Sequence, residues 1–461
     1  MDSQRSRLIR IKEGMSATYQ SAVESLLALA PELWPSSGEK PRRKFDLEHM
    51  RVLTEALGHP ERRFPSLIVA GTNGKGSTSA TLASILSAAG HRTGLYTSPH
   101  LVRVNERIAL DGEAISDSEF AEMHSRIEAI SQSLVRGGKL DQHPSFFETL
   151  TAMAFEYFAS SGVDLAVLEV GIGGRLDATN VADPMLSIIT DISLDHMEWL
   201  GSTLTEITRE KAGILRPKGT LITLAQHPEV NDALGEAVRQ VDARVINASA
   251  FVPPITPASE AFAAESGGTP RNRYALEVLG QPIMVDSPLA GRHQLRNVAL
   301  AVAAAVELNQ SFGFKISPQH ITEGVANTSW PGRFQVVPGF PEIVLDVAHN
   351  PAGAWALRSA LSSRYDGQPL TIIFGAMRDK AIAEIAELLF PLAEQVIAVK
   401  VDSPRAASGE EIQQFAGHVG TPIALAGDLG SAIKTARQCG RPIVITGSVY
   451  LVGAALELLG S

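Results

Sequence analysis

Short apolar runs recur along the chain, and each is followed by glycine or polar residues and then by a helical pattern. Residues 67–70 form one such run, which predicts a buried strand. A glycine-rich segment follows, and residues 77–89 have the pattern of a helix that is closed by Gly90. Further strands of this kind are predicted at residues 93–97, 164–170 and 185–190. The pattern predicts an α/β domain built on a parallel central sheet.

The strands of this first domain are accompanied by helical patterns and by one segment of different character. Helices are predicted within residues 16–58, around a loop at 35–44, and at residues 147–160, 203–215 and 297–308. Residues 253–273 are rich in small and polar residues, which predicts a loop or insertion. Apolar residues on both sides of Gly280, at 274–279 and 282–285, predict a hairpin.

The alternation of strands and helices begins again after residues 328–333, whose sequence TSWPGR is typical of a linker. Strands are predicted at 343–348, 370–374, 396–401 and 442–446, and helices at 353–363, 380–394, 409–417 and 449–459. This pattern predicts a smaller, Rossmann-like, doubly wound domain without a phosphate loop of its own. We expect a first domain over residues 1–328, a linker at 329–332 and a second domain over 333–461.

Composition narrows the classes of protein that fit this pattern. The net charge of −10 argues against a general nucleic-acid surface, so anionic ligands would need local cationic pockets. The longest apolar run, residues 298–306, is too short to span a bilayer. A single cysteine, Cys439, excludes an intrachain disulfide and suits a reducing cytoplasm. We expect a cytoplasmic protein that binds neither nucleic acid nor membrane.

The strand, glycine-rich loop and helix at residues 66–89 predict a nucleotide site. Glycines let backbone N–H groups turn toward an anion, the helix N-terminus adds positive potential, and Lys75 supplies a full charge. Ser77 would place a hydroxyl on the accompanying Mg²⁺. The segment departs from the usual phosphate-loop pattern, because Val69 replaces its first glycine and Gly76 separates Lys75 from Ser77.

Other polar residues at strand ends allow two interpretations each. Glu169 ends a buried strand and needs a cation, which is either an arginine such as Arg175 or Mg²⁺. His196 is a structural hydrogen bonder or a ligand, and Lys211 by itself would belong to a solvated helix face. Asp346 or Asn350 would cap the following helix, or Asp346 would meet a nucleotide across a cleft. Arg333 would be a surface charge or a phosphate clamp.

Nine motifs, in matching order from residue 71 to 380, together resemble one known family. They are GTNGKGST at 71–78, SPHLVRVNERI at 98–108, FFETLTAMAF at 146–155, LEVGIGGRLDATN at 168–180, LDH at 194–196, REKAGI at 209–214, PGRFQ at 331–335, LDVAHNP at 345–351 and MRDK at 377–380. The family is that of folylpolyglutamate synthases and dihydrofolate synthases, which belongs with the Mur-type ATP-dependent amide ligases.

The resemblance implies a reaction and its ligands. ATP activates the carboxylate of a pteroate as an acyl phosphate, and the amine of L-glutamate displaces the phosphate. The substrates would be dihydropteroate, reduced folates and L-glutamate, the cofactors ATP and Mg²⁺, and the protein a monomer. The RLDATN turn at residues 175–180 resembles the bacterial form that also acts on dihydropteroate.

The resemblance also implies roles for individual residues. ATP would be held by Gly74, Lys75, Gly76, Ser77, Thr78, Asn297, Arg333 and Asp346. Mg²⁺ would be ligated by Ser77, Glu169, His196 and Lys211, the last as a carbamylated lysine. The pteroate would contact Ser145, Phe146, Phe147, Glu148, Leu176, Asp177 and Ala178. Lys75 and Lys211 would be catalytic, and His349 would help at the glutamate or phosphate side.

Three alternatives stay open at this point. The enzyme could extend folate tails only, without acting on dihydropteroate. A Mur peptidoglycan ligase fits less well, because those enzymes carry GKT or GKS where this chain has Lys75-Gly76-Ser77. A phosphate-loop ATPase without ligase chemistry would share the loop, but not the second domain with its DVAHNP motif.

Overall fold

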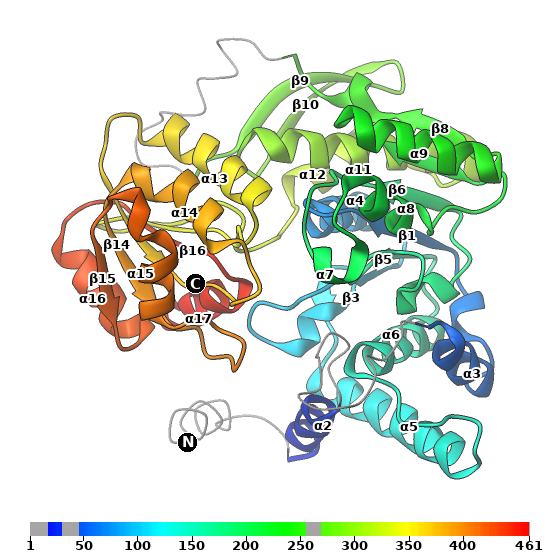
Figure 1. The fold of residues 1–461 in the computed structure, drawn as a ribbon. Helices are drawn as coiled ribbons and strands as arrows, with labels where there is room; N and C mark the ends of the chain where they lie inside the picture. Colours follow the sequence, from blue (N-terminus) through cyan, green and yellow to red (C-terminus); the bar gives the residue numbers. More distant parts are fainter. Residues whose placement is uncertain (1–16, 30–45, 255–268, 461) are drawn as a thin grey trace.

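The computed structural model of the chain describes residues 17–29, 46–254 and 269–460. Its largest sheet has eight strands, and it lies on the right in Figure 1. In spatial order the strands are β4 (Glu113–Ala114), β3 (Ile108–Leu110), β2 (Thr93–Tyr96), β5 (Leu165–Glu169), β1 (Ser66–Ala70), β6 (Leu186–Ile189), β7 (Thr220–Thr223) and β8 (Arg244–Asn247). The six strands from β2 to β8 are parallel, whereas β3 and β4 are antiparallel at one edge.

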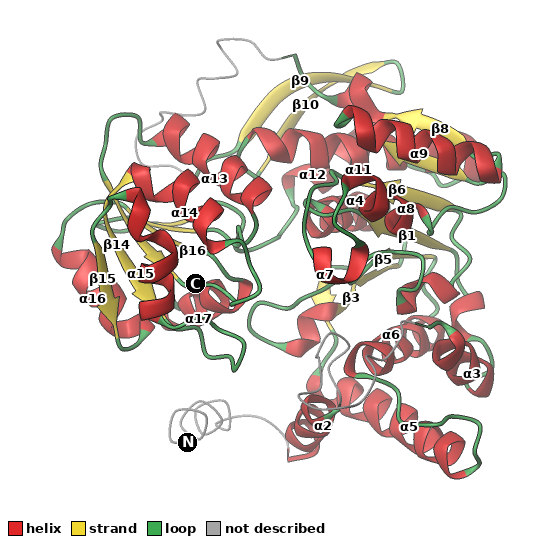
Figure 2. Ribbon diagram, viewed as in Figure 1, coloured by secondary structure: helices red, strands yellow, loops and turns green. Residues whose placement is uncertain are grey.

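Helices cover both faces of this sheet (Figure 2). They are α2 (Ala17–Ala28), α3 (Glu48–Ala56), α4 (Lys75–Ala88), α5 (Asp117–Arg136), α6 (Phe146–Ser161), α7 (Met197–Leu200), α8 (Leu204–Ala212), α9 (Pro228–Val241), α11 (Arg292–Phe312) and α12 (Pro318–Ala326). Alternate residues of β1 enter different cores: Leu67 and Val69 pack in the core that contains α4 and α11, and Ile68 packs in the core that contains α6.

The second domain contains a six-stranded sheet, on the left in Figure 1. Its spatial order is β11 (Gln335–Val337), β12 (Ile343–Leu345), β16 (Ile443–Thr446), β13 (Leu370–Phe374), β14 (Ala393–Val399) and β15 (Ile423–Ala426). Only β11 is antiparallel to its neighbour. The accompanying helices are α13 (Pro351–Arg364), α14 (Ile382–Leu389), α15 (Gly409–Ala416), α16 (Leu429–Gln438) and α17 (Val449–Leu459).

The predicted fold class is confirmed, with corrections to its elements. The first sheet is not wholly parallel, because of its β3–β4 edge, and the helix predicted at 380–394 ends at Leu389. Pro391 lies in the short 3₁₀ turn that follows, where a proline cannot continue the α-helical hydrogen bonds. The predicted hairpin is present as β9 (Asn272–Val278) and β10 (Gln281–Ser287). Most of the predicted 253–273 insertion and the 35–44 loop lie outside the described residues.

Membrane spans can be assessed for the described ranges. None of the helices in them is both long and apolar enough to cross a bilayer.

Helix α12 packs against the phosphate-loop helix α4, and Gly324 lies at a close contact between them. A Cβ atom on Gly324 would lie 2.3 Å from Cα and 2.6 Å from the backbone nitrogen of Ile85. The hydroxyl of Ser84 also donates a hydrogen bond to the Gly324 carbonyl, at 2.7 Å. Because the obstacle is backbone, α12 must shift to admit any side chain at position 324.

We therefore expect Gly324→Ala to destabilise the first domain by about 1–3 kcal/mol, the usual cost of overpacking. Gly235→Ala is the matched control, because Gly235 lies in α9 and its added Cβ would meet only the end of the Arg239 side chain, at 3.5 Å. That variant should be neutral or more stable by about 0.5–1 kcal/mol through helix propensity. Urea unfolding followed by circular dichroism compares them, and equal midpoints would contradict the close packing of α12 on α4.

Candidate functional site

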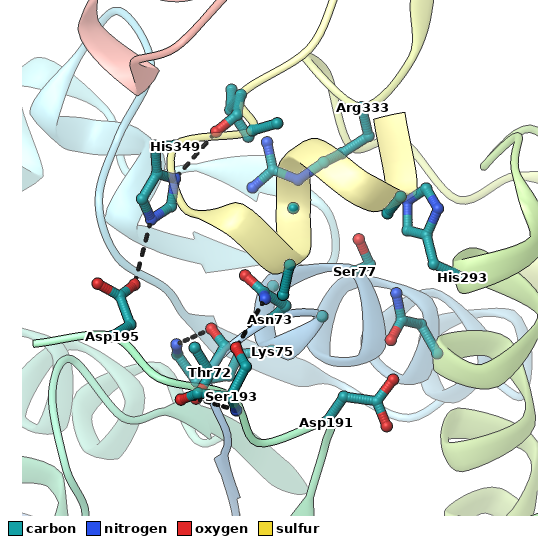
Figure 3. A pocket seen from close by; sticks show the side chains of 18 of the residues that line it. Thr72, Asn73, Lys75, Ser77, Asp191, Ser193, Asp195, His293, Arg333 and His349 are labelled. Carbon is teal, nitrogen blue, oxygen red and sulfur yellow. Dashed lines mark hydrogen bonds and ion pairs between the residues drawn. The ribbon is translucent and has the colours of Figure 1, made fainter. Parts of the chain in front are cut away.

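A cavity of about 350 Å³ lies between the two domains, beyond the carboxyl ends of the parallel strands. The loops after β1, β5 and β6 reach it, as expected where adjacent parallel strands end at one edge of a sheet. The start of α11, Arg333 directly after the linker, and the start of α13 complete its walls. Figure 3 shows side chains from both domains around it.

The glycine-rich loop forms the floor of this cavity. Gly74 is the N-cap of α4, has a φ of +90°, and lies so close to the Asn297 amide that a side chain would collide with it. The Lys75 ammonium folds back on its own loop and donates to the carbonyls of Gly71 and Thr72, at 3.2 and 3.1 Å. The positive end of α4 and the Lys75 charge therefore meet at one point, as an anion site requires.

A second layer of contacts fixes the loop. The backbone N–H groups of Thr72 and Asn73 donate to the Asp191 carbonyl at 2.9 and 3.2 Å. The Asp191 carboxylate in turn accepts hydrogen bonds from two nitrogens of Arg296, from Nε at 2.9 Å and from a terminal nitrogen at 2.6 Å. Sequence reasoning missed this bidentate pair, which joins residues 105 positions apart. Thr78 is buried and donates to the Asn297 carbonyl at 3.3 Å, so its hydroxyl holds α4 to α11.

The four predicted metal ligands, Ser77, Glu169, His196 and Lys211, all line this cavity. Burial raises the pKa of Glu169 to about 7, against the opposing charge of Lys75, and its carboxylate accepts the Ser98 N–H at 3.2 Å. Arg175 pairs instead with Glu210, at 2.8 Å, so the alternative of a Glu169–Arg175 ion pair is wrong.

The donor set of these residues fits a hard cation. Burial, followed by the charge of Lys380, lowers the pKa of His196 to about 3, so the imidazole is neutral and can act as a ligand. No three His, Cys, Asp or Glu side chains gather closely enough for a metal within the described ranges. Any Mg²⁺ must therefore add the Ser77 hydroxyl, phosphate oxygens or water to Glu169 and His196, which is usual for this ion.

Lys211 is buried, contrary to the solvated-face interpretation. Its ammonium donates to the Gly71 carbonyl at 2.7 Å, the same carbonyl that Lys75 contacts. Burial, and then the charge of Lys75, lower the pKa of Lys211 to about 7. The sequence contained a signal of this burial: Lys211 follows the buried Ile207 by four positions on α8, so both residues lie on the inward face of the helix.

The linker and the second domain supply Arg333 and Asp346. Arg333 is not a surface charge: it lines the cavity, and burial lowers its pKa, opposed by Asp346 and Glu169. Of the two residues predicted as possible caps of α13, Asn350 is the cap, accepting the Gly353 N–H at 2.8 Å, and Asp346 is not. The Asp346 carboxylate accepts the N–H groups of Phe334 and Ala348 instead, at 2.8 and 2.9 Å.

The two domains meet at Asp195, which sequence reasoning noted only as a neighbour of His196. Its carboxylate accepts Lys380 Nζ at 2.8 Å and the Asn350 amide at 3.0 Å, and lies 3.7 Å from Nε2 of His349. Although burial acts in the opposite direction, His349 and Lys380 hold the pKa of Asp195 well below its usual range. The Asn350 amide also exchanges hydrogen bonds with Asn73 of the phosphate loop.

A second cavity of about 240 Å³ adjoins the first and shares its Ser98, Gly171, His196 and His349 walls. Cationic side chains converge on it: Arg107 from the first domain, and Lys380 and Arg405 from the second. Such a cavity is suited to carboxylates, because fixed cations replace the water that a carboxylate loses on entry.

The residues predicted to contact a pteroate divide into two groups. Phe147 lines the second cavity, and the Arg107 guanidinium lies 5.2 Å above the ring of Phe146. Ser145 and Glu148 form the capping box of α6, and buried Asp177 accepts four hydrogen bonds within its own turn. Leu176 is half-buried and Ala178 is buried beside Asp177.

Comparison with known proteins finds similarity over nearly the whole chain. Residues 69–305 match the family described as Mur ligase middle domain, and residues 332–449 match Mur ligase, glutamate ligase domain. The dihydrofolate synthase/folylpolyglutamate synthase of Bacillus subtilis (strain 168) is 34% identical over 421 residues, which cover 88% of this chain and 93% of that protein.

Two solved structures extend this similarity to three dimensions. Mycobacterium tuberculosis folylpolyglutamate synthase complexed with ADP has a TM-score of 0.85 and 32% identity, covering 96% of this chain and 99% of its own. E. coli FolC in complex with DHPP and ADP has a TM-score of 0.80 and 28% identity, covering 96% and 97%.

The placement of Lys75 generates a test of the nucleotide site. We expect Lys75→Ala to lower the rate of ATP turnover by about 10²–10³, the usual effect of losing one contact to transition-state charge. The fold should survive, because within the described part of the chain the ammonium donates hydrogen bonds only to its own loop. Lys139→Ala, at an exposed position, is the matched control for losing a lysine. ADP release measures the rates, and near-normal turnover in Lys75→Ala would show that the loop does not hold the phosphates.

Proposed function

Because the chain belongs to the dihydrofolate synthase/folylpolyglutamate synthase family of Mur-type ligases, we propose that it joins L-glutamate to dihydropteroate and to reduced folates. It is an ATP-dependent ligase, and ATP supplies the energy for the new amide bond. The complex of E. coli FolC with DHPP and ADP supports a pteroate as one of the substrates. The observation that carries the proposal is the pair of adjoining cavities, one at the phosphate loop and one lined by cations.

The first cavity is proposed to hold ATP. Its phosphates would lie on the N–H groups of residues 74–77, beside Lys75, with the adenosine directed toward Asn297, Arg333 and Asp346. Ser77, Glu169 and His196 would hold Mg²⁺, which neutralises charge on the transferring phosphoryl group when bound. His293, which sequence reasoning missed, lies beside Asp346 and Arg333 and extends this wall.

The second cavity is proposed to hold the two carboxylate substrates. The pteroate carboxylate attacks the γ-phosphorus, ADP leaves, and an acyl phosphate results. The glutamate amine then attacks the acyl carbon, phosphate leaves, and the amide is formed. Arg107, Lys380 and Arg405 would fix the carboxylates that do not react, so that the amine and the acyl carbon lie in line.

His349 is proposed to take the proton that the glutamate ammonium must lose. Its Nδ1 donates to the Val347 carbonyl at 2.9 Å, which leaves Nε2 as the acceptor. Nε2 lies 3.7 Å from the Asp195 carboxylate, which would stabilise the imidazolium once it forms. The residue lines both cavities and is therefore placed at their junction.

Water must be kept from the acyl phosphate, and we propose that the two domains enclose the site to exclude it. We propose the boundary between them at residues 329–332, with the pteroate held by Ser145–Glu148 and Leu176–Ala178 on the first domain. The single cysteine is the reason to propose a cytoplasmic protein, and we propose that it acts as a monomer.

The function is tested by measuring ADP formation and product mass with dihydropteroate or tetrahydrofolate as the acceptor. We expect ADP release that requires both L-glutamate and an acceptor, with one glutamate added per ADP. Activity with tetrahydrofolate alone would restrict the enzyme to tail extension. ADP release without an acceptor or glutamate would identify an ATPase and contradict the proposed ligase.

Lys211 is proposed to be carbamylated in the active enzyme. Its buried amine is held at the Gly71 carbonyl near Lys75, where a second positive charge is unfavourable. A neutral amine attacks CO₂, forms an N–C bond and releases one proton. The product is a carbamate whose oxygens can ligate Mg²⁺ beside Glu169.

We expect ¹³CO₂ to give a carbamate resonance in the wild-type protein that is absent from Lys211→Ala. Lys211→Ala should lose nearly all activity, and a small carboxylic acid in solution should restore part of it by filling the vacated ligand position. Lys211→Arg is the matched control, because it fills the space with a cation and should not be rescued. Full activity in CO₂-free buffer, with no resonance, would refute carbamylation.

A further inference from the structure

Gly76 is one of the two residues at which this phosphate loop departs from the usual pattern, and the fold explains why a glycine stands there. Gly76 lies in the first turn of α4 and is not among the glycines with positive φ, so its conformation suits any residue. The restriction is spatial. A Cβ atom on Gly76 would lie 2.5 Å from Cζ2, 2.9 Å from Cε2 and 3.0 Å from Nε1 of Trp330. The Trp330 indole occupies the space where a side chain at position 76 would be.

Trp330 also contacts the cationic side of the nucleotide cavity. It lies on the linker, three residues before Arg333, and the Arg333 guanidinium is 5.9 Å from the centre of its ring. A cation at this distance from an indole is attracted by the ring face. Arg333 is half-buried and lines the cavity opposite the phosphate loop (Figure 3).

No hydrogen bond sets the position of the indole. Its Nε1 is buried and has no partner among the residues that the structure describes. Packing therefore positions the ring: it contacts Gly76 and Arg333 and packs against the core that contains α4 and α11. The linker that carries it is fixed to the second domain, because the Gly332 carbonyl accepts the Val347 N–H at 3.1 Å and Phe334 donates to Asp346.

We propose that Trp330 is a positioning residue that holds Arg333 and the linker against the phosphate loop, and that Gly76 is required because it admits the indole. The inference deepens the proposed function and rests on the nucleotide site within it. Position 76 is therefore glycine because a side chain there would displace the indole that couples the two domains. The indole is then a second link between the nucleotide loop and the second domain, beside the Asn73–Asn350 hydrogen bonds, and it connects phosphate binding to Arg333.

A cycle of four proteins tests this: the wild type, Gly76→Ala, Trp330→Ala and the double variant. The dissociation constant for ADP with Mg²⁺ is measured by calorimetry on the full chain, and kcat and KM for ATP are measured in parallel. We expect each single substitution to raise the dissociation constant for ADP by about tenfold. In the kinetics, the change should appear mostly as a higher KM for ATP. In the Trp330→Ala background, Gly76→Ala should raise the dissociation constant for ADP less than about twofold, because the indole no longer obstructs a side chain at position 76.

An equal cost of Gly76→Ala in both backgrounds would overturn the inference, since it would show that the glycine serves the phosphates directly. Trp330→Phe should retain most of the affinity, because it keeps an aromatic face for Arg333, and it replaces Trp330→Ala in the cycle if that variant unfolds. A wild-type protein that does not bind ADP would instead refute the proposed function. Tight ADP binding by every variant would refute the coupling alone.

Discussion

The assembled site depends on the contacts that the Asp195 carboxylate makes across the domain boundary. It belongs to the first domain, and its hydrogen-bonding partners Lys380 and Asn350 belong to the second. Asp195 and Lys380 are both largely buried, so separating them would leave two poorly solvated charges, which is far more costly than losing an exposed ion pair. This requirement for a partner keeps His349 and the cationic side chains of the second cavity beside the phosphate loop. Without the Asp195 contacts, each domain would carry only part of the site.

The charge distribution within the site explains how an acidic protein can bind anions. The chain carries a net charge of −10, but Lys75, Lys211, Arg107, Arg333, Lys380 and Arg405 converge on the two adjoining cavities. Lys75 and Lys211 share the Gly71 carbonyl, an arrangement in which the charge of Lys75 disfavours that of Lys211. An incoming phosphate relieves that repulsion. The same crowding favours conversion of one amine to an anion, so the structure links the lowered pKa of Lys211 to the chemistry proposed for it.

Local patterns predicted the fold better than the site. The strand–loop–helix unit at residues 66–89 and the alternation after residue 343 were legible because each contains its own apolar periodicity. Helix α5 was missed although Ser116 and Glu119 form a capping box at its start, which was a usable signal. Strand β15 is a half-exposed edge strand, and its apolar run IALA is only four residues long. The Asp195–Lys380 pair joins residues 185 positions apart, and the indole of Trp330 reaches a glycine 254 positions earlier, so no local pattern could reveal either contact.

The central claim is that one site, assembled from two domains, joins ATP cleavage to amide formation by activating a carboxylate. The most direct test labels both carboxyl oxygens of dihydropteroate with ¹⁸O and analyses the phosphate released during glutamate addition by mass spectrometry. Attack of the carboxylate on the γ-phosphorus predicts one ¹⁸O atom in each phosphate, because the oxygen that bridges the acyl phosphate leaves with phosphorus. Phosphate that contains no ¹⁸O, formed together with the amide, would contradict the account.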